Sequence, residues 1–254
     1  MNDLEISLLV ALAVFASAMT TMLLYPKLPT HHRTNETRDV VRLGMGMISV
    51  LTSLVLGLLI ASAKGTFDTT DHDMRAYAAD FILLNQTLRD YGPQADGVRK
   101  MLLTYVEGAV HELWPDKTDV QRATFEDPKA GSLLDHSMEA ILTLKPTNDD
   151  QVWLRQRALE IAAGLIHTRW SLVINQHGTI SPIETGIVVA WIMVIFASFG
   201  LNAPPNAIVV SAFFVCSLSI GAAIFLVREL DSPFNGMIMI SPGPMQNAVA
   251  HLSR

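Results

Sequence analysis

The chain has 254 residues, of which 50% are hydrophobic and only 17% are charged, and its formal net charge is −6. This composition argues against a water-soluble fold and fits a chain that combines membrane helices with soluble helices. Nucleic acid is not expected as a partner, because the chain lacks the basic patch with interleaved aromatic residues that nucleic-acid binders carry.

Two charge-free runs near the N-terminus, residues 6–24 and 43–63, are long enough to cross a bilayer. A hydrocarbon core of about 30 Å requires about 20 helical residues. The first run could alternatively be a cleaved signal sequence, but it lacks a basic segment before it and is longer than the apolar part of a typical signal. We therefore expect two membrane-spanning helices. The loop between them carries His31 and His32, which could bind a metal or sense pH but are more simply a solvated pair.

The second run has two faces of different character. One face carries small residues at spacings that let helices pack closely, namely Gly44, Gly46, Ser53 and Gly57. A neighbouring face carries Val50, Leu54 and Leu58 at four-residue steps. Such an apolar stripe either packs against another helix or lines a constriction that gates an ion path by dewetting.

The middle segment, residues 64–182, predicts a helical bundle outside the membrane. Its apolar residues recur at three- and four-residue steps, which predicts helices over residues 74–91, 98–113, 132–144 and 152–173. The last helix has a coiled-coil-like seam that consists of Val152, Gln156, Leu159, Ala163, Ile166, Trp170 and Val173. We expect this seam to pack against partner helices.

Three aspartates, Asp68, Asp71 and Asp73, lie between the second span and the first helix of this bundle. One of them, or a neighbouring threonine, is expected to cap a helix that begins near Met74, where acidic residues also suit the helix dipole. The alternative is a site for a hard divalent ion. It is the weaker hypothesis, because EF-hand spacing and a glycine turn are missing.

The C-terminal part contains a second pair of spans. No charged residue occurs from Thr185 to Val227, and consecutive prolines at 204 and 205 interrupt the stretch. Because two prolines cannot continue a helix, we predict spans over residues 183–201 and 207–227, joined by a tight turn. Glu184, at the mouth of the third span, either reaches water at the interface or lines an ion path. The lone Cys216 permits no intrachain disulfide.

Four spans place both termini and the middle segment on one side of the membrane. The sequence does not indicate which side of the membrane this is, because the short flanking segments of the two faces carry equal numbers of basic residues. The sequence has no nucleophile elbow, phosphate loop, dinucleotide fingerprint or paired metal motif. We therefore expect no enzymatic activity, no cofactor and no bound metal.

Four short segments stand in order around the predicted spans, namely Ser-Leu-Val-Leu-Gly-Leu at 53–58, Arg-Lys-Met-Leu-Leu-Thr-Tyr at 99–105, Ile-Ser-Pro at 180–182 and Glu-Leu-Asp-Ser-Pro-Phe at 229–234. Together they resemble bestrophins, the pentameric anion channels, and more closely the bestrophin-like family of uncharacterised bacterial membrane proteins. The first segment is similar to the Ser-Phe-Val-Leu-Gly-Phe segment of the bestrophin pore neck. The last is similar to the acidic Pro-Phe motif that ends the bestrophin membrane core.

The resemblance implies a homo-oligomer, a pentamer, with a pore neck and a turn after the last span. It assigns Val50, Leu54 and Leu58 to the neck and Asp231, Pro233 and Phe234 to the turn.

The chain departs from bestrophins at two places. Leu54 and Leu58 stand where bestrophins have phenylalanines, so the aromatic edges that contact anions are lost. The acidic run that follows the Pro-Phe motif in calcium-gated members is replaced by Asn-Gly-Met-Ile-Met-Ile at 235–240, so calcium gating is not implied. This apolar segment is expected to lie along the membrane surface or on a neighbouring subunit.

The sequence thus predicts an all-α integral membrane protein with two pairs of transmembrane helices and an intervening extramembrane helical bundle. The predicted parts are the first pair of spans (1–63), the bundle (64–182), the second hairpin (183–227) and a tail with the Pro-Phe turn (228–254). The predicted function is an oligomeric channel for small ions, anions by resemblance, in the bacterial inner membrane. The alternative is a non-conducting scaffold or sensor that binds a partner protein through the seam.

Overall fold

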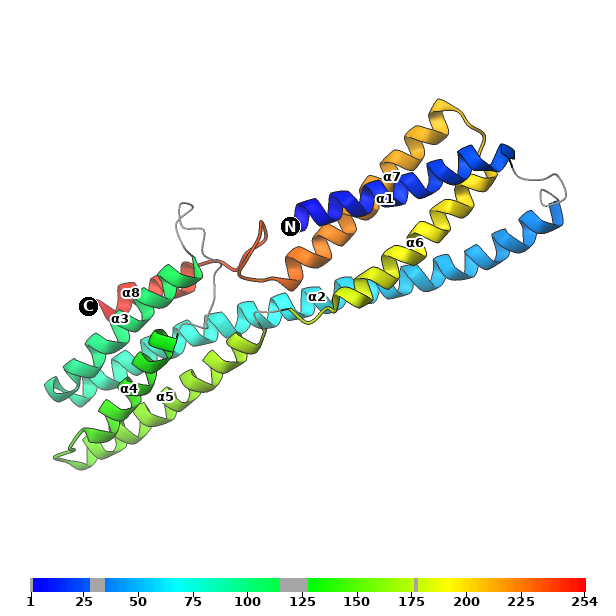
Figure 1. The fold of residues 1–254 in the computed structure, drawn as a ribbon. Coiled ribbons are helices and arrows are strands. Elements are labelled where there is room, and N and C mark those ends of the chain that lie inside the picture. The colour runs from blue at the N-terminus through cyan, green and yellow to red at the C-terminus, as the bar shows by residue number, and fades with distance from the viewer. Residues whose placement is uncertain (1, 28–34, 115–127, 176–177) are drawn as a thin grey trace. The chain divides into compact units, whose positions relative to one another are not determined.

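The computed structural model describes residues 2–27, 35–114, 128–175 and 178–254 (Figure 1). Every regular element in these ranges is helical: α1 (Asp3–Leu24), η1 (Tyr25–Lys27), α2 (Asn35–Tyr91), η3 (Pro93–Ala95), α3 (Asp96–Leu113), α4 (Pro128–Thr143), α5 (Asp149–Asn175), α6 (Pro182–Asn202), α7 (Ala207–Asp231) and α8 (Gly243–Leu252). The helices α1, α2, α6 and α7 are long and apolar enough to cross a membrane. The predicted fold class is confirmed. The pair His31 and His32 lies outside the described residues.

The described chain divides into two compact units. The first comprises Met1–Gly65 and Thr179–Asp231, and the second comprises Thr66–Gly178 and Ser232–Arg254. The long helix α2 contributes its N-terminal part to the first unit and its C-terminal part to the second. The candidate pore residues therefore belong to the first unit, whereas the predicted bundle helices belong to the second.

In the first unit, α1 packs against both α6 and α7. Two glycines allow the close approach. A Cβ on Gly200 of α6 would lie 2.2 Å from the carbonyl oxygen of Ala18, and a Cβ on Gly221 of α7 would lie 2.8 Å from the Cβ of Ala11. The hydroxyl of Ser17 also donates to the Met193 carbonyl oxygen at 3.1 Å. Small residues and a hydroxyl thus hold these helices together, as in other membrane bundles.

The predicted turn between the last two spans is observed. The structure ends α6 at Asn202 and begins α7 at Ala207, so the two prolines fall between the helices. The side-chain oxygen of Asn206 accepts a hydrogen bond from the Val209 amide at 2.9 Å, which caps the first turn of α7. At the other end of α7, Arg228 pairs with Asp3 of α1 at 2.6 Å between Nε and Oδ1.

The second unit has a hydrophobic core to which α2, α3, α4, α5 and α8 all contribute. The buried face of α2 contributes Met74, Tyr77, Phe81, Leu84 and Leu88, and α3 contributes Leu102, Tyr105 and Val106. Helices α4, α5 and α8 complete the core with Ile141, Leu165, Leu172, Met245 and Leu252. The predicted helical faces of residues 74–91 and 98–113 are the faces that the structure buries.

The predicted start of a new helix near Met74 is wrong. Helix α2 runs from Asn35 to Tyr91 through the polar stretch, which contains no proline to break it. Its polar side chains do not cap a terminus: Thr70, for example, donates to the Thr66 carbonyl oxygen within the helix at 2.8 Å. Consequently none of the aspartates at 68, 71 and 73 has an N-cap role.

Helix α5 buries a different face from its predicted seam. Ala158, Ile161, Ala162, Leu165 and Leu172 point into the core of the second unit. On the seam, Leu159, Ile166 and Val173 are half-buried, whereas Val152, Gln156, Ala163 and Trp170 are exposed. Leu159, Ile166 and Val173 pack against the edge of the core, so the seam lies only partly outside the chain. Whether its exposed residues bind another protein stays a prediction.

Candidate functional site

The exposed apolar stripe on α2 is the main candidate site. Val50, Leu54 and Leu58 are 73%, 71% and 68% exposed, and Leu43 and Met47 extend the row toward the N-terminus of the helix at 73% and 72%. Steps of three and four residues put these side chains on one face. We call this row the α2 stripe. No residue of the described chain covers it to any large degree.

The opposite face of the same helix segment is buried. Thr52, Leu59 and Ala63 are at most 8% exposed. The Thr52 hydroxyl donates to the Ile48 carbonyl oxygen at 2.7 Å, so its polar atom is satisfied inside the helix. Helix α2 therefore uses one face within its own chain and presents the other outward.

A shallow depression lies at the N-terminal end of the stripe. Its lining combines two charged residues with the first part of the apolar row, and consists of Asp39, Arg42, Leu43, Gly46, Met47 and Val50. Asp39 and Arg42 are exposed. The apolar row thus begins beside charges of both signs.

The small residues beside the stripe have no close neighbour in the described chain. A Cβ on Gly44, Gly46 or Gly57 would meet nothing within 4 Å. The Ser53 hydroxyl donates to the Ser49 carbonyl oxygen at 2.9 Å. Close packing at these positions therefore does not occur within the chain, and stays a prediction for contact with another molecule. Within the chain, the close-packing role belongs to Gly200 and Gly221, which the sequence analysis did not identify.

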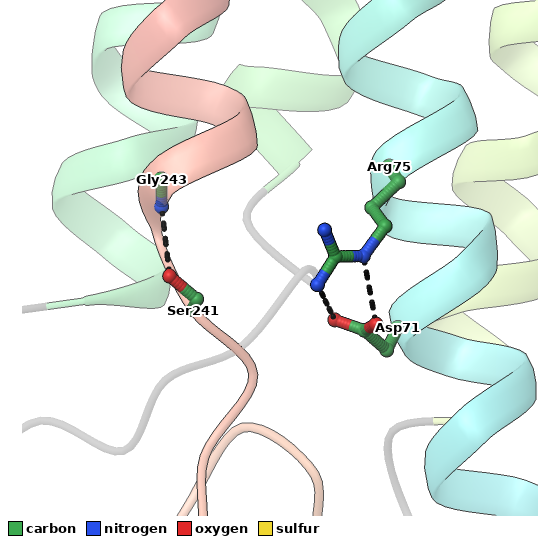
Figure 2. Close-up of polar contacts among 4 residues, drawn as sticks. All are labelled: Asp71, Arg75, Ser241 and Gly243. Atoms are coloured by element: carbon green, nitrogen blue, oxygen red, sulfur yellow. Dashed lines mark hydrogen bonds and ion pairs between the residues drawn. The ribbon is translucent and has the colours of Figure 1, made fainter.

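The aspartates that follow the second span do not form a three-ligand site. In the part of the chain that the structure describes, no group of three or more His, Cys, Asp or Glu side chains could hold a metal ion. Asp71 instead pairs with Arg75 one turn later at 2.8 Å between Oδ2 and Nε (Figure 2). Asp73 accepts a hydrogen bond from the Ser171 hydroxyl of α5 at 3.2 Å. Asp68 is exposed on α2.

Glu184 is exposed in the first turn of α6. Ser181 caps this helix, because its hydroxyl accepts a hydrogen bond from the Ile183 amide at 3.3 Å. A carboxylate in the first turn also interacts favourably with the helix dipole. This placement suits an interfacial anchor, and a role in an ion path stays a prediction.

The acidic Pro-Phe motif connects segments that are distant in the sequence. Asp231 Oδ1 accepts hydrogen bonds from the backbone amides of Thr179 and Ile180 at 2.8 and 3.3 Å, so the end of α7 holds the entry to α6. Phe234 is buried, and its ring meets Trp114 edge-on with centroids 6.4 Å apart. Asp231 thus satisfies backbone donors that precede the third span, a role that sequence reasoning missed.

A buried tyrosine pair in the second unit was also missed. The hydroxyls of Tyr77 and Tyr105 lie 2.7 Å apart, with neither side chain more than 1% exposed. Burial is the main cause that raises the pKa of Tyr77 well above its ordinary value. Both phenols therefore stay neutral at physiological pH and link α2 to α3. Only the positions of Tyr77 and Tyr105 on apolar helical faces could have indicated this, because two phenols so far apart in sequence carry no pairing signal.

The α8 end of this unit has its own local cap. The Ser241 hydroxyl accepts a hydrogen bond from the Gly243 amide at 3.2 Å, where α8 begins (Figure 2). This bond satisfies one of the free amides at a helix N-terminus. It fixes the point at which the chain leaves the Pro-Phe turn and enters the last helix.

Comparison with known proteins gives one family and one fold. A model of the bestrophin-like domain matches residues 12–245. No curated protein sequence matches the chain. Among solved structures, two single-residue variants of a bacterial bestrophin homolog from Klebsiella pneumoniae match with TM-scores of 0.69 and 0.67 at 14% and 13% identity. The first match covers 99% of this chain and 98% of the other, and the second covers 97% of each. A variant of a crystallised membrane protein matches with a TM-score of 0.68 at 14% identity, over 96% of both chains.

Proposed function

The chain belongs to the bestrophin-like family, and we propose that its copies assemble in the cell membrane into a homo-oligomeric channel for small ions, lined by the α2 stripe. The fold similarity to bacterial bestrophin homologs supports the arrangement of helices. At that low identity it does not carry a pore or an ion preference. The proposal therefore depends on the geometry of this chain.

The asymmetry of α2 is the observation that carries the proposal. One face of the helix is buried in the chain, while the α2 stripe is about 70% exposed over four turns. Lipid could cover such a stripe. However, Gly46, Ser53 and Gly57 lie beside it with open space around them, and small residues let a second helix backbone approach closely. Copies of α2 could pack through these residues and turn their stripes toward a common axis.

A surface on α5 of the extramembrane unit gives separate support for the proposal of an oligomer. Trp170 is 56% exposed and Ile174 is 71% exposed on α5, and both belong to a unit that contains many charged residues. Large apolar side chains grouped on a water-facing helix mark a surface that binds protein. A second copy of the chain would cover this surface while it brings another α2 into the membrane assembly.

The chemistry of the proposed neck predicts how it would conduct. Val50, Leu54 and Leu58 offer neither charge nor hydrogen bonds, so a narrow ring of them would oppose ions by excluding water. Leucine lacks the positive aromatic edge that attracts anions. The neck would therefore act as a hydrophobic gate, and the charged groups outside it would set the ion preference.

Conductance of the purified oligomer in planar bilayers tests this proposal. Leu54→Ala and Leu58→Ala should each raise the single-channel conductance several-fold, because a smaller side chain widens the neck and weakens dewetting. Leu8→Ala on α1 is the matched control, since Leu8 is 63% exposed on another membrane helix and should leave the conductance unchanged. Silent bilayers that contain an intact oligomer would contradict conduction. An equal response to Leu8→Ala would contradict the position of the pore.

The exposed seam of α5 favours a second candidate, a scaffold or sensor that binds a different protein. Cross-linking of the complete protein in its membrane distinguishes the two. Capture of one heterologous protein that is lost on Trp170→Glu, from a chain that does not conduct, would support the scaffold. Particle symmetry in detergent is a further discriminator, because a ring with α2 at the axis supports the channel whereas a monomer or a closed dimer supports the scaffold.

A further inference from the structure

An apolar loop follows the last membrane helix. Met237, Ile238 and Met239 are 74%, 36% and 50% exposed, although methionine and isoleucine are usually buried. No charged residue occurs between Ser232 and Ala250. The core of the second unit does not bury these three large apolar side chains, so it does not account for their presence on the loop.

The two ends of this loop are held firmly. Pro233 and Phe234 are buried before it and Ile240 is buried after it. The Ile240 amide donates to the Pro233 carbonyl oxygen at 3.0 Å, and Trp114 Nε1 donates to the Ile240 carbonyl oxygen at 2.9 Å. Gly236 has a φ of 114°, a conformation that favours glycine, at the turn. With both ends anchored in this way, the three side chains between them lie outside the core.

The short segment between the end of α7 and Met237 limits which apolar surroundings the exposed side chains of the loop can reach. Helix α7 crosses the membrane and ends at Asp231, so six residues lead from there to Met237. Six extended residues span at most about 20 Å. The headgroup layer extends several ångströms beyond the hydrocarbon core on each side, which brings the interface within reach of the loop.

We propose that Met237, Ile238 and Met239 insert into the bilayer interface beside the end of α7. The short connection to α7 favours lipid as the partner of these side chains, since lipid surrounds α7 wherever this helix is embedded in a membrane. The loop has no lysine or arginine, so its insertion depends on apolar contact and not on attraction to anionic lipid. This proposal does not rest on ion conduction and would hold equally for a non-conducting oligomer.

Site-directed fluorescence tests the insertion in the complete protein. In a Cys216→Ala background, Met237→Cys and Met239→Cys are each labelled with a polarity-sensitive fluorophore and reconstituted into phosphatidylcholine vesicles. Lys100→Cys on α3 is the control, because Lys100 is exposed and far along the chain from any span. Some vesicles carry lipid with a doxyl quencher near the headgroup, and aqueous iodide is the opposing quencher.

The loop labels should emit at shorter wavelength than the Lys100→Cys label, be quenched several-fold more by doxyl lipid, and be quenched several-fold less by iodide. Addition of phosphatidylglycerol should leave the doxyl quenching unchanged. Iodide quenching equal to that of the control would place the loop in water and overturn the proposal. Protection from both quenchers would place the loop against protein, such as a second copy, and would overturn it equally.

Discussion

The close contact at Gly200 predicts that adding one methyl group at this position would push α1 and α6 apart. A Cβ at this position would lie 2.2 Å from both the Ala18 carbonyl oxygen and the Thr21 hydroxyl. Because non-bonded carbon and oxygen atoms need at least about 3 Å, Gly200→Ala requires the helices to move apart by about 1 Å. That shift would also lengthen the hydrogen bond between Ser17 and the Met193 carbonyl oxygen, now 3.1 Å, beyond its useful range.

The expected cost follows from these two effects. Overpacking costs about 1 to 3 kcal/mol, and loss of an interhelical hydrogen bond in a membrane costs about 0.6 kcal/mol. Replacing glycine with alanine in a helix returns up to about 1 kcal/mol. The net loss for Gly200→Ala is therefore about 1 to 3 kcal/mol.

Gly186→Ala on the same helix is the matched control, because a Cβ there would meet nothing within 4 Å. Unfolding of the two variants and the parent in mixed detergent, followed by circular dichroism, measures the difference. Gly186→Ala should be as stable as the parent or slightly more stable. If Gly200→Ala matched Gly186→Ala, the close approach of α1 and α6 described here would be refuted.

Three further predictions concern contacts between distant segments. Asp231→Ala should lower the free energy of unfolding by about 1.5 to 3 kcal/mol, because two backbone amides lose a charged acceptor, and Asp231→Asn should lower it less; chemical unfolding measures both. Tyr77→Phe should cost about 1 kcal/mol, because the hydrogen bond between the two buried hydroxyls is lost while Arg169 stays as a partner of Tyr105. Since burial raises the pKa of Tyr77 above 10 in the folded protein, the folded state binds this proton more tightly. The contribution of Tyr77 to stability should therefore be constant below about pH 10 and be lost as the pH rises further, so the parent should lose stability above about pH 10 more steeply than Tyr77→Phe; equal slopes would contradict the burial of this phenol. Arg228→Met should lower the free energy of unfolding by at most about 1 kcal/mol. A double-mutant cycle with Asp3→Asn measures the coupling energy of the pair, and a value of zero would contradict a stabilising ion pair.

The membrane helices could be predicted because their signal is local. Each span is a charge-free run of sufficient length, and the prolines at 204 and 205 interrupt the last run where α6 and α7 separate. The buried faces of residues 74–91 and 98–113 followed from their helical periodicity. The continuity of α2 did not follow. Its polar stretch contains residues that can either cap a new helix or bond within an existing one, and Thr70 and Asp71 do the latter.

The candidate site was only partly predictable for a related reason. Periodicity identified the face of Val50, Leu54 and Leu58 and the α5 seam as apolar, but a face that packs inside the chain and one that is left outside have the same spacing. The structure left the first exposed and the second half-exposed, and it buried other faces of these helices more deeply. The predicted packing glycines met no neighbour, whereas Gly200 and Gly221 did. A glycine's role depends on which helix passes over it.

The solvent of each segment, the four spans and the helical class could be predicted from the order of residues, because transfer of a side chain from water to lipid depends on that residue and its immediate neighbours. The packing of the helices sets which helical faces are covered, which glycines lie at crossings and where Asp231 finds its donors. Asp231 and Thr179 are 52 positions apart, and only the return of α7 to the start of α6 brings them within 2.8 Å. Such contacts depend on the paths of whole helices, which no local pattern of residue types specifies.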